Sequence, residues 1–189
     1  MTHAIRIHEQ GGPDVLRWES VEVGAPGSGE VRLRQTAVGL NFLDVYHRNG
    51  AYQLPELPTA LGMEAAGIVD QIGEGVENFE IGKRYCTLPY FYYNKGASAD
   101  FVNIDARYVT PAPDNLTAVE SSSVWMQFMT AYYPIVHLCN ASPKKHILVT
   151  AGTSTAGNAA LNIGKLFGAN MITTTRFEKN QNYLIDSGA

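Results

Sequence analysis

The stretch HILVTAGTSTAG, residues 146–157, decides the fold of this chain. Its apolar start predicts a buried strand from His146 to Thr150, and the small polar residues after it predict a tight turn. Beyond the turn, apolar side chains recur at helical spacing, and Gly168 is expected to cap the helix. The residues expected on the buried face of this helix are Ala156, Ala160, Ile163 and Phe167.

A second strand and a second helix follow. The pattern predicts a strand from Met171 to Thr175 and a helix from Glu178 to Ser187, so residues 146–189 read as β-α-β-α, the opening of a parallel nucleotide-binding sheet. A doubly wound sheet needs two βαβαβ halves, and only two strands are predicted here. We expect either part of a longer protein or a remnant whose sheet something else completes.

The preceding residues read as a β-rich half followed by a helix. Alternating apolar residues between Gly and Pro turns predict strands over 4–7, 15–23, 30–38, 64–72 and 99–104, and a short helix over 42–48 that stops at Asn49-Gly50. Thr117 and Glu120 have capping-box spacing, so a helix is expected from there to about His137. We expect an α/β protein with a β-rich domain over residues 1–122 and an incomplete nucleotide-binding domain over residues 123–189.

Composition excludes several classes of protein. Of the 189 residues, 45% are hydrophobic and 17% charged, which is typical of a globular chain rather than a disordered one. The net charge of −4 offers no basic surface for nucleic acid. No apolar run approaches the roughly 20 residues that span a bilayer, and two cysteines are too few for a disulfide framework. We expect a cytoplasmic protein whose partner is a small molecule, not nucleic acid or a membrane.

The turn at residues 151–157 is a candidate phosphate site. Small residues between a strand and a helix let backbone amides approach a pyrophosphate at the positive end of the helix. The residues assigned to this role are Gly152, Ser154, Thr155, Ala156 and Gly157. Because only two glycines of the dinucleotide fingerprint are present, an ordinary tight strand-to-helix turn is the open alternative.

The end of the second strand bears on the choice of cofactor. NAD-binding folds place a carboxylate there to accept the ribose hydroxyls, whereas this chain has three threonines followed by Arg176. A guanidinium pairs well with a phosphate, so Thr175 and Arg176 predict NADPH as the cofactor. The alternative is that Arg176 is a solvated cation at a helix start, near Glu178.

Three blocks of sequence carry a family resemblance. They are NFLDVYHRNGAY at residues 41–52, LGMEAAGIV at residues 61–69 and AGTSTAG at residues 151–157. Together they resemble the medium-chain dehydrogenase/reductase superfamily, specifically its zinc-independent, zeta-crystallin-like quinone oxidoreductase branch, over the whole chain. The resemblance implies a GroES-like catalytic domain followed by the first part of a Rossmann-type domain, with NADPH in the cleft between them.

The resemblance also implies roles for individual residues. Residues 125–132 look like the helix that crosses between the domains, which would bring Thr130 near the nicotinamide. Asn41, Tyr46, Arg48 and Tyr52 would lie in the cleft, with Asn41 serving cofactor and substrate alike. Donors there would stabilise the negative charge that develops on the oxygen of a quinone or enone during hydride transfer. For the tyrosines, packing with the hydroxyl in water is the open alternative.

Two further features have both a structural and a functional interpretation. Asp44 and Arg48 are four residues apart on a predicted helix, so we expect them to form an ion pair, either in the cleft or on the surface. The aromatic run from Tyr90 to Tyr93 either lines a pocket for a planar substrate or makes a hydrophobic loop contact.

A catalytic zinc site is not expected. The resemblance places Asn41 and Met63 where zinc-dependent relatives have a cysteine and a histidine, and neither side chain replaces those ligands well. Glu64 is expected to be a structural hydrogen-bond acceptor, and Cys86 and Cys139 to be packing residues. A zinc alcohol dehydrogenase is retained only as a third interpretation.

Two functions of different classes stay open. The first is an NADPH-dependent, zinc-independent reductase of quinones or enones. The second is a non-catalytic family member that binds nucleotide weakly or acts as a structural or partner-binding module, suggested by the missing half-sheet. A homodimer is also left open, because the family's sheet-edge contact would lie in parts of the fold outside these residues.

Overall fold

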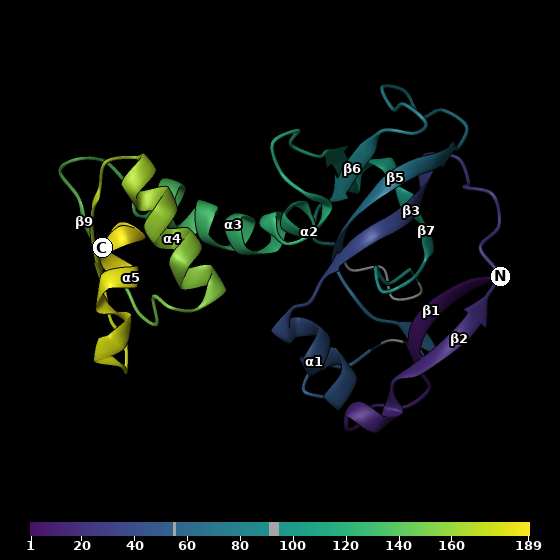
Figure 1. The fold of residues 1–189 in the computed structure, drawn as a ribbon, viewed down its shortest axis with the longest axis horizontal. Helices are drawn as coiled ribbons and strands as arrows, with labels where there is room; N and C mark the ends of the chain where they lie inside the picture. The colour runs from purple at the N-terminus through teal and green to yellow at the C-terminus, as the bar shows by residue number, and fades with distance from the viewer. Residues whose placement is uncertain (55, 91–94) are drawn as a thin grey trace. The chain divides into compact units, whose positions relative to one another are not determined.

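The computed structural model describes residues 1–54, 56–90 and 95–189. The chain forms two compact units, residues Met1–Trp125 and Met126–Ala189. The division falls within helix α3 (Val124–Tyr132), whereas the sequence placed it between residues 122 and 123. The two units are described separately below (Figure 1).

The first unit contains two antiparallel sheets. The larger has the order β7-β3-β5-β6-β8, formed by Phe101–Asp105, Glu30–Gly39, Glu64–Ile72, Arg84–Thr87 and Val109–Pro111. The smaller has the order β2-β1-β4, formed by Arg17–Val21, Thr2–Ile7 and Thr59–Ala60. The predicted strands are confirmed, with shifts of a few residues at some ends. Strands β4, β6 and β8 were not predicted, because two to four residues are too short to show a period.

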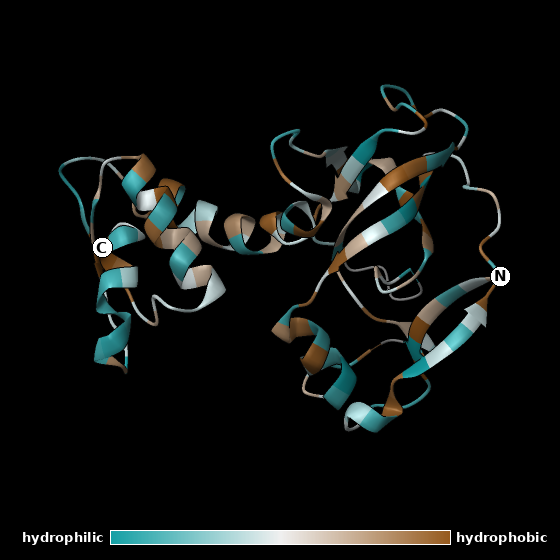
Figure 2. Cartoon of the chain, in the orientation of Figure 1, coloured by the Kyte–Doolittle hydropathy of each residue, from teal (hydrophilic) through white to brown (hydrophobic). Residues whose placement is uncertain are grey.

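Strands β3 and β5 carry the core of this unit. Val31, Leu33 and Val69 are fully buried, and Leu33 pairs directly with Val69 across the two strands. Inward apolar side chains alternate with polar ones along β3, as expected for a sheet with one covered face. Figure 2 shows the resulting hydrophobic and hydrophilic bands along these strands. The paired strands therefore bury one apolar face together.

The first two helices of this unit follow the signals predicted for their ends. Helix α1 (Phe42–Asn49) ends at Gly50, whose φ of 85° is left-handed, and α2 (Ala118–Ser121) begins with the expected capping box between Thr117 and Glu120. Short 3-10 turns occupy Pro13–Val15 and Ala106–Tyr108.

The prediction of one continuous helix to His137 is wrong. The Ser122 hydroxyl donates to the Val119 carbonyl at 2.8 Å and the Ser123 hydroxyl to the Glu120 carbonyl at 3.2 Å, so side chains take over carbonyls at the end of α2 and the helix breaks. After α3 the chain widens into a π-helix, Tyr133–Leu138. Pro134 lies in its first turn and has no N–H to continue the α-helical ladder.

The second unit has the predicted β-α-β-α order. Strands β9 (His146–Val149) and β10 (Asn170–Thr173) are parallel neighbours, joined by helix α4 (Thr155–Leu166). The 3-10 turn Glu178–Asn180 and helix α5 (Gln181–Asp186) follow, and Gly168 ends α4 with a φ of 73°.

The buried face of α4 differs from the predicted one. Ala160 and Ile163 are buried as expected, but Ala156 is half-buried and Phe167 is exposed. The face instead includes Gly157, Leu161 and Gly164. A Cβ on Gly164 would lie 2.1 Å from Met171 Sδ, so small residues allow the helix to approach β10 closely.

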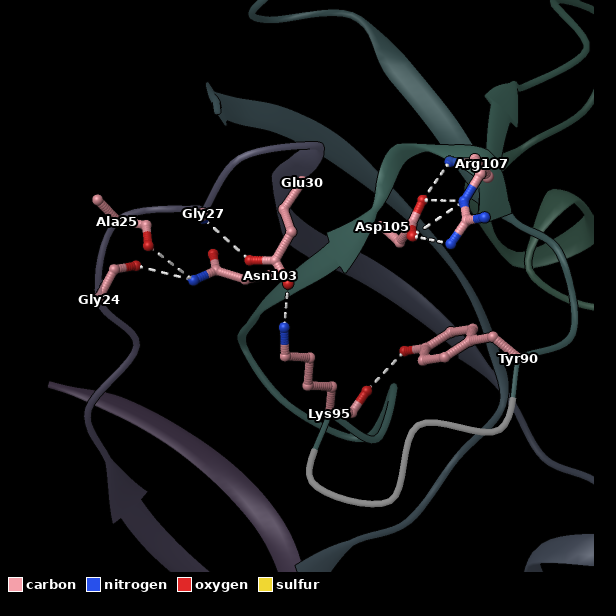
Figure 3. A network of polar contacts seen from close by, with 9 residues as sticks. All are labelled: Gly24, Ala25, Gly27, Glu30, Tyr90, Lys95, Asn103, Asp105 and Arg107. Atoms are coloured by element: carbon pink, nitrogen blue, oxygen red, sulfur yellow. Dashed lines mark hydrogen bonds and ion pairs between the residues drawn. The ribbon is translucent and has the colours of Figure 1, made fainter. Parts of the chain in front are cut away.

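A polar network fastens the edge of the larger sheet (Figure 3). Glu30 forms an ion pair with Lys95 and accepts a hydrogen bond from the Gly27 amide at 3.0 Å. The Asn103 amide donates to the carbonyls of Gly24 and Ala25. Burial raises the pKa of Glu30, but the bonds from Lys95 and Gly27 outweigh it and hold that pKa below its ordinary value.

We expect Glu30→Gln to reduce the acid sensitivity of this unit. A lowered folded-state pKa gives stability that is present above the unfolded value of 4.5 and is lost as pH falls through the folded value. Urea unfolding at pH 7 and pH 3 should show a larger loss for wild type than for the variant, by about 1 kcal/mol at most. Glu80→Gln, which removes an exposed pair with Lys83, is the control, and equal acid losses in wild type and Glu30→Gln would contradict the expectation.

Candidate functional site

The turn after β9 is built around a capped helix start. Ser154 is the N-cap of α4, and its hydroxyl oxygen accepts a hydrogen bond from the Gly157 amide at 3.1 Å. The Gly152 amide donates to the Thr174 carbonyl at 3.1 Å. The amides of Thr155 and Ala156 come first in the helix and have no carbonyl one turn behind them within it. These two amides therefore point out of the helix start, where an anion would be stabilised.

The two glycines of the turn have packing roles. A Cβ on Gly152 would lie 2.2 Å from Thr173 Oγ1, and a Cβ on Gly157 would lie 2.5 Å from the Ala151 carbonyl oxygen. Ala151 itself has a left-handed φ of 53°, a conformation that costs a non-glycine residue energy. The turn is thus closely packed, as in an ordinary strand-to-helix turn. The backbone amides of the first helical residues, Thr155 and Ala156, have no carbonyl partner within the helix.

Arg176 follows β10 at the same edge of the sheet. Its guanidinium carbon lies 5.7 Å from the centre of the Phe177 ring, as does the Lys179 ammonium. Within the described ranges, neither cation has a carboxylate within 4.0 Å, so the approach to Glu178 does not form an ion pair. A cavity of about 430 Å³ adjoins Arg176 and is lined by Thr173, Thr175, Arg176, Glu178, Gln181, Leu184, Ile185 and Ala189. An unpaired guanidinium beside a cavity is suited to a phosphate.

Asn41 lies just before α1 and is held at two points. Its backbone amide donates to Asp44 Oδ2 at 2.9 Å, and its side-chain Nδ2 donates to Glu64 Oε1 at 3.0 Å. Both carboxyl groups are buried, at 5% and 2% exposure. Burial raises the pKa of Asp44, although hydrogen bonds from the amides of Asn41 and Gly62 oppose the rise. Glu64 thus accepts a hydrogen bond as the sequence predicted.

The expected Asp44–Arg48 ion pair does not form. Asp44 is buried and turned toward backbone amides, which a carboxylate in the first helical turn caps well. Arg48 is half-buried, its Nε is buried without a hydrogen-bond partner, and it has no salt bridge within the parts of the chain that the structure describes. Helix capping has therefore replaced the i, i+4 pair.

Tyr46 and Tyr52 lie side by side. Their ring centres are 5.5 Å apart, and the Tyr52 amide donates to the Tyr46 carbonyl at 3.0 Å. Both rings are partly exposed, and the exposed Phe42 ring lies 6.3 Å from Tyr46. The exposure of Phe42 was not predicted from the sequence, because a hydrophobic residue at a helix start gives no sign that it faces solvent.

Two further residues singled out in the sequence, Thr130 and Tyr90, use their hydroxyl hydrogens within the protein. Thr130 is exposed on α3, and its hydroxyl donates to the Met126 carbonyl at 2.6 Å, which leaves only its lone pairs for a ligand. Tyr90 is 1% exposed and its hydroxyl donates to the Lys95 carbonyl, so it cannot line an open pocket. The rest of the aromatic run, residues 91–93, lies outside the described residues.

The cysteine prediction is half wrong. Cys86 is buried, whereas Cys139 is exposed after the π-helix and packs in no core. Met63 is buried just before β5. No cluster of three or more histidine, cysteine or acidic side chains that could hold a metal occurs within residues 1–54, 56–90 and 95–189. In the same ranges, no helix is both long and apolar enough to cross a membrane.

The chain is similar in sequence to one domain family and to several reductases. Residues 27–114 match the alcohol dehydrogenase GroES-like domain. A 2-haloacrylate reductase from Burkholderia sp. is 36% identical over 95% of this chain, which spans 54% of that relative. A quinone oxidoreductase from Salmonella typhimurium is 30% identical over the whole chain, which spans 57% of it. The chain thus spans little more than half the length of these curated relatives.

Solved structures agree with the sequence relatives. A quinone oxidoreductase from Pseudomonas syringae superposes on the whole chain with a TM-score of 0.92 and 29% identity, over 57% of its own length. The Escherichia coli quinone oxidoreductase, solved in complex with NADPH, gives a TM-score of 0.87 at 29% identity and the same coverage. In its fold, its sequence blocks and these relatives, the chain is similar to the medium-chain dehydrogenase/reductase superfamily and, within it, to quinone oxidoreductases.

Proposed function

We propose that the protein is an NADPH-dependent oxidoreductase that reduces a quinone or another conjugated carbonyl compound without zinc. The observation that carries the proposal is the edge of the second unit, where a capped helix start and a guanidinium without a salt bridge to any described residue follow neighbouring parallel strands. The names of its relatives support a reductase, and one of the similar structures was solved with NADPH.

The second unit has the donors that a dinucleotide phosphate requires. Gly152, Ser154, Thr155, Ala156 and Gly157 would hold the pyrophosphate through the amides at the start of α4. The cavity beside Arg176 would accept the adenosine end, with Thr175 and Arg176 binding its 2′-phosphate. The negative charge of that phosphate would then be met by a guanidinium that forms no salt bridge within the described parts of the chain.

The first unit has groups for the reacting end. When bound, NADPH supplies the hydride, and negative charge develops on the substrate oxygen. One Nδ2 hydrogen of Asn41 is taken by Glu64, and its second Nδ2 hydrogen would donate to cofactor or substrate. The Tyr46 and Tyr52 hydroxyls would donate to the same oxygen. Thr130 belongs to the second unit and would accept a hydrogen bond from the cofactor. Arg48 would act only through its terminal nitrogens, because its Nε is buried.

The side chains at the two positions in question support a reaction without zinc. An asparagine amide and a buried thioether, at Asn41 and Met63, are weak ligands for Zn²⁺ compared with thiolate and imidazole. Asn41 is also engaged with Glu64. No step of the proposed reaction needs a metal ion to polarise the carbonyl, since hydrogen-bond donors serve that purpose.

The proposal is tested by NADPH oxidation with the protein expressed from its own gene. After treatment with a chelator, we expect absorbance at the NADPH band to fall when a benzoquinone or a simple enone is added. A requirement for added zinc would contradict zinc independence. Tight NADPH binding without turnover of either acceptor class would favour the alternative, a non-catalytic nucleotide-binding module.

A further inference from the structure

Glu64 and Asn41 form a partly buried contact between residues that are 23 positions apart in the sequence. Glu64 begins β5 and is 2% exposed, and its Oε1 accepts a hydrogen bond from Asn41 Nδ2 at 3.0 Å. A buried carboxyl group is costly unless hydrogen bonds compensate its loss of water. The contact with Asn41 is part of that compensation, so the two side chains constrain each other.

Gly39 provides the space for this contact. It pairs with Glu64 across β3 and β5, and a Cβ placed on it would lie 2.6 Å from Glu64 Cγ and 2.8 Å from Oε1. The same Cβ would lie 2.3 Å from the Ser122 carbonyl oxygen. A side chain at position 39 would collide with the Glu64 side chain. The glycine therefore leaves room for the Glu64 carboxyl group to contact Asn41, two residues after Gly39.

Asp44 fixes the other end of Asn41. Its carboxyl group accepts a hydrogen bond from the Asn41 backbone amide at 2.9 Å, so backbone and side chain of Asn41 are each bound to a buried acid. An asparagine amide that is free to turn can exchange its oxygen and nitrogen. With Nδ2 bound to Glu64, the amide oxygen and the second Nδ2 hydrogen have fixed directions.

We propose that Glu64 is the positioning residue for Asn41, setting which atoms of its carboxamide meet the cofactor and substrate. This inference rests on the proposed function, in which Asn41 touches both. Glu64 itself need not touch either ligand, because it acts through the amide it holds. Ordering a catalytic group before the reaction is a known source of rate acceleration.

A double-mutant cycle tests the proposal with the native protein. Glu64→Leu removes the acceptor and should lower kcat about tenfold, whereas Glu64→Gln retains an oxygen acceptor and should restore most of the rate. In an Asn41→Ala background, Glu64→Leu should have no further effect on kcat. Tyr90→Phe, which removes a buried hydrogen bond to Lys95, is the control and should lower stability while leaving kcat unchanged. Independent, multiplying losses from Asn41→Ala and Glu64→Leu would overturn the proposal.

The amide signals of Asn41 provide a test that needs no turnover. In ¹⁵N-resolved NMR spectra, Asn41→Ala identifies the side-chain NH₂ pair, and Glu64→Gln should shift one of its two hydrogens. An unchanged pair would overturn the proposal, and this measurement applies even if Glu64→Leu does not fold. A wild-type protein that oxidises no NADPH would overturn the proposed function instead, and the NMR result would then decide alone whether Glu64 holds Asn41.

Discussion

Replacing Arg176 with alanine is expected to weaken NADPH binding by about 1.5 to 3 kcal/mol, roughly tenfold to 150-fold, and to leave NADH binding nearly unchanged. The guanidinium has no carboxylate partner among the described residues and adjoins a cavity at the end of β10. A charge-assisted contact to the 2′-phosphate, which only NADPH carries, would be lost. Calorimetric titration of both nucleotides measures the difference directly.

The control for this experiment is Lys165→Ala. Lys165 is an exposed cation of the same unit, and its ammonium donates to the Asp186 carbonyl. The variant removes the same formal charge from a residue that does not line the cavity, so it should change the affinity for either nucleotide only slightly. If Arg176→Ala weakened NADPH and NADH equally, the assignment of the 2′-phosphate to Arg176 would be wrong.

Gly157→Ala is expected to lower the stability of the second unit by about 1 to 3 kcal/mol. The new Cβ would lie 2.5 Å from the Ala151 carbonyl oxygen, a backbone atom that cannot turn aside as a side chain would. Ala151 already has a left-handed backbone, so the turn has little freedom to relax. Urea unfolding followed by circular dichroism measures the loss.

Gly24→Ala serves as the comparison for Gly157→Ala. A Cβ at Gly24 meets no atom within 4 Å, so this change should leave the unfolding midpoint almost unmoved. A similarly small effect at Gly157 would mean that the strand-to-helix turn adapts easily. The tight approach of β9 to α4 would then not explain why glycine occurs there.

Local signals in the sequence predicted much of the fold. The strand from Glu64 to Ile72 and the helix that stops at Gly50 depend on neighbours a few residues apart, and both are confirmed. The end of α2 near Ser123 was not predicted. Hydrogen bonds from serine hydroxyls to helix carbonyls do not change the hydrophobic periodicity of the sequence.

The candidate site was harder to predict because its contacts are distant in sequence. The bond from Asn41 to Glu64 depends on the pairing of Gly39 with Glu64, which a single sequence does not reveal. Spacing alone suggested that Asp44 would meet Arg48, but the cost of burying a carboxyl group directs Asp44 to backbone amides instead. The strand-to-helix turn at residues 151–157 was easier to predict, since its residues lie within one local motif.

The two cysteines differ in exposure, so their reaction rates with a thiol reagent report whether the first unit is folded. Cys139 is exposed, while Cys86 is fully buried in the first unit and its burial raises the pKa of the thiol. A thiol-specific dye should therefore modify one sulfur at once and the other only when that unit opens. The slow labelling step would report the rate at which the first unit opens, with no engineered probe.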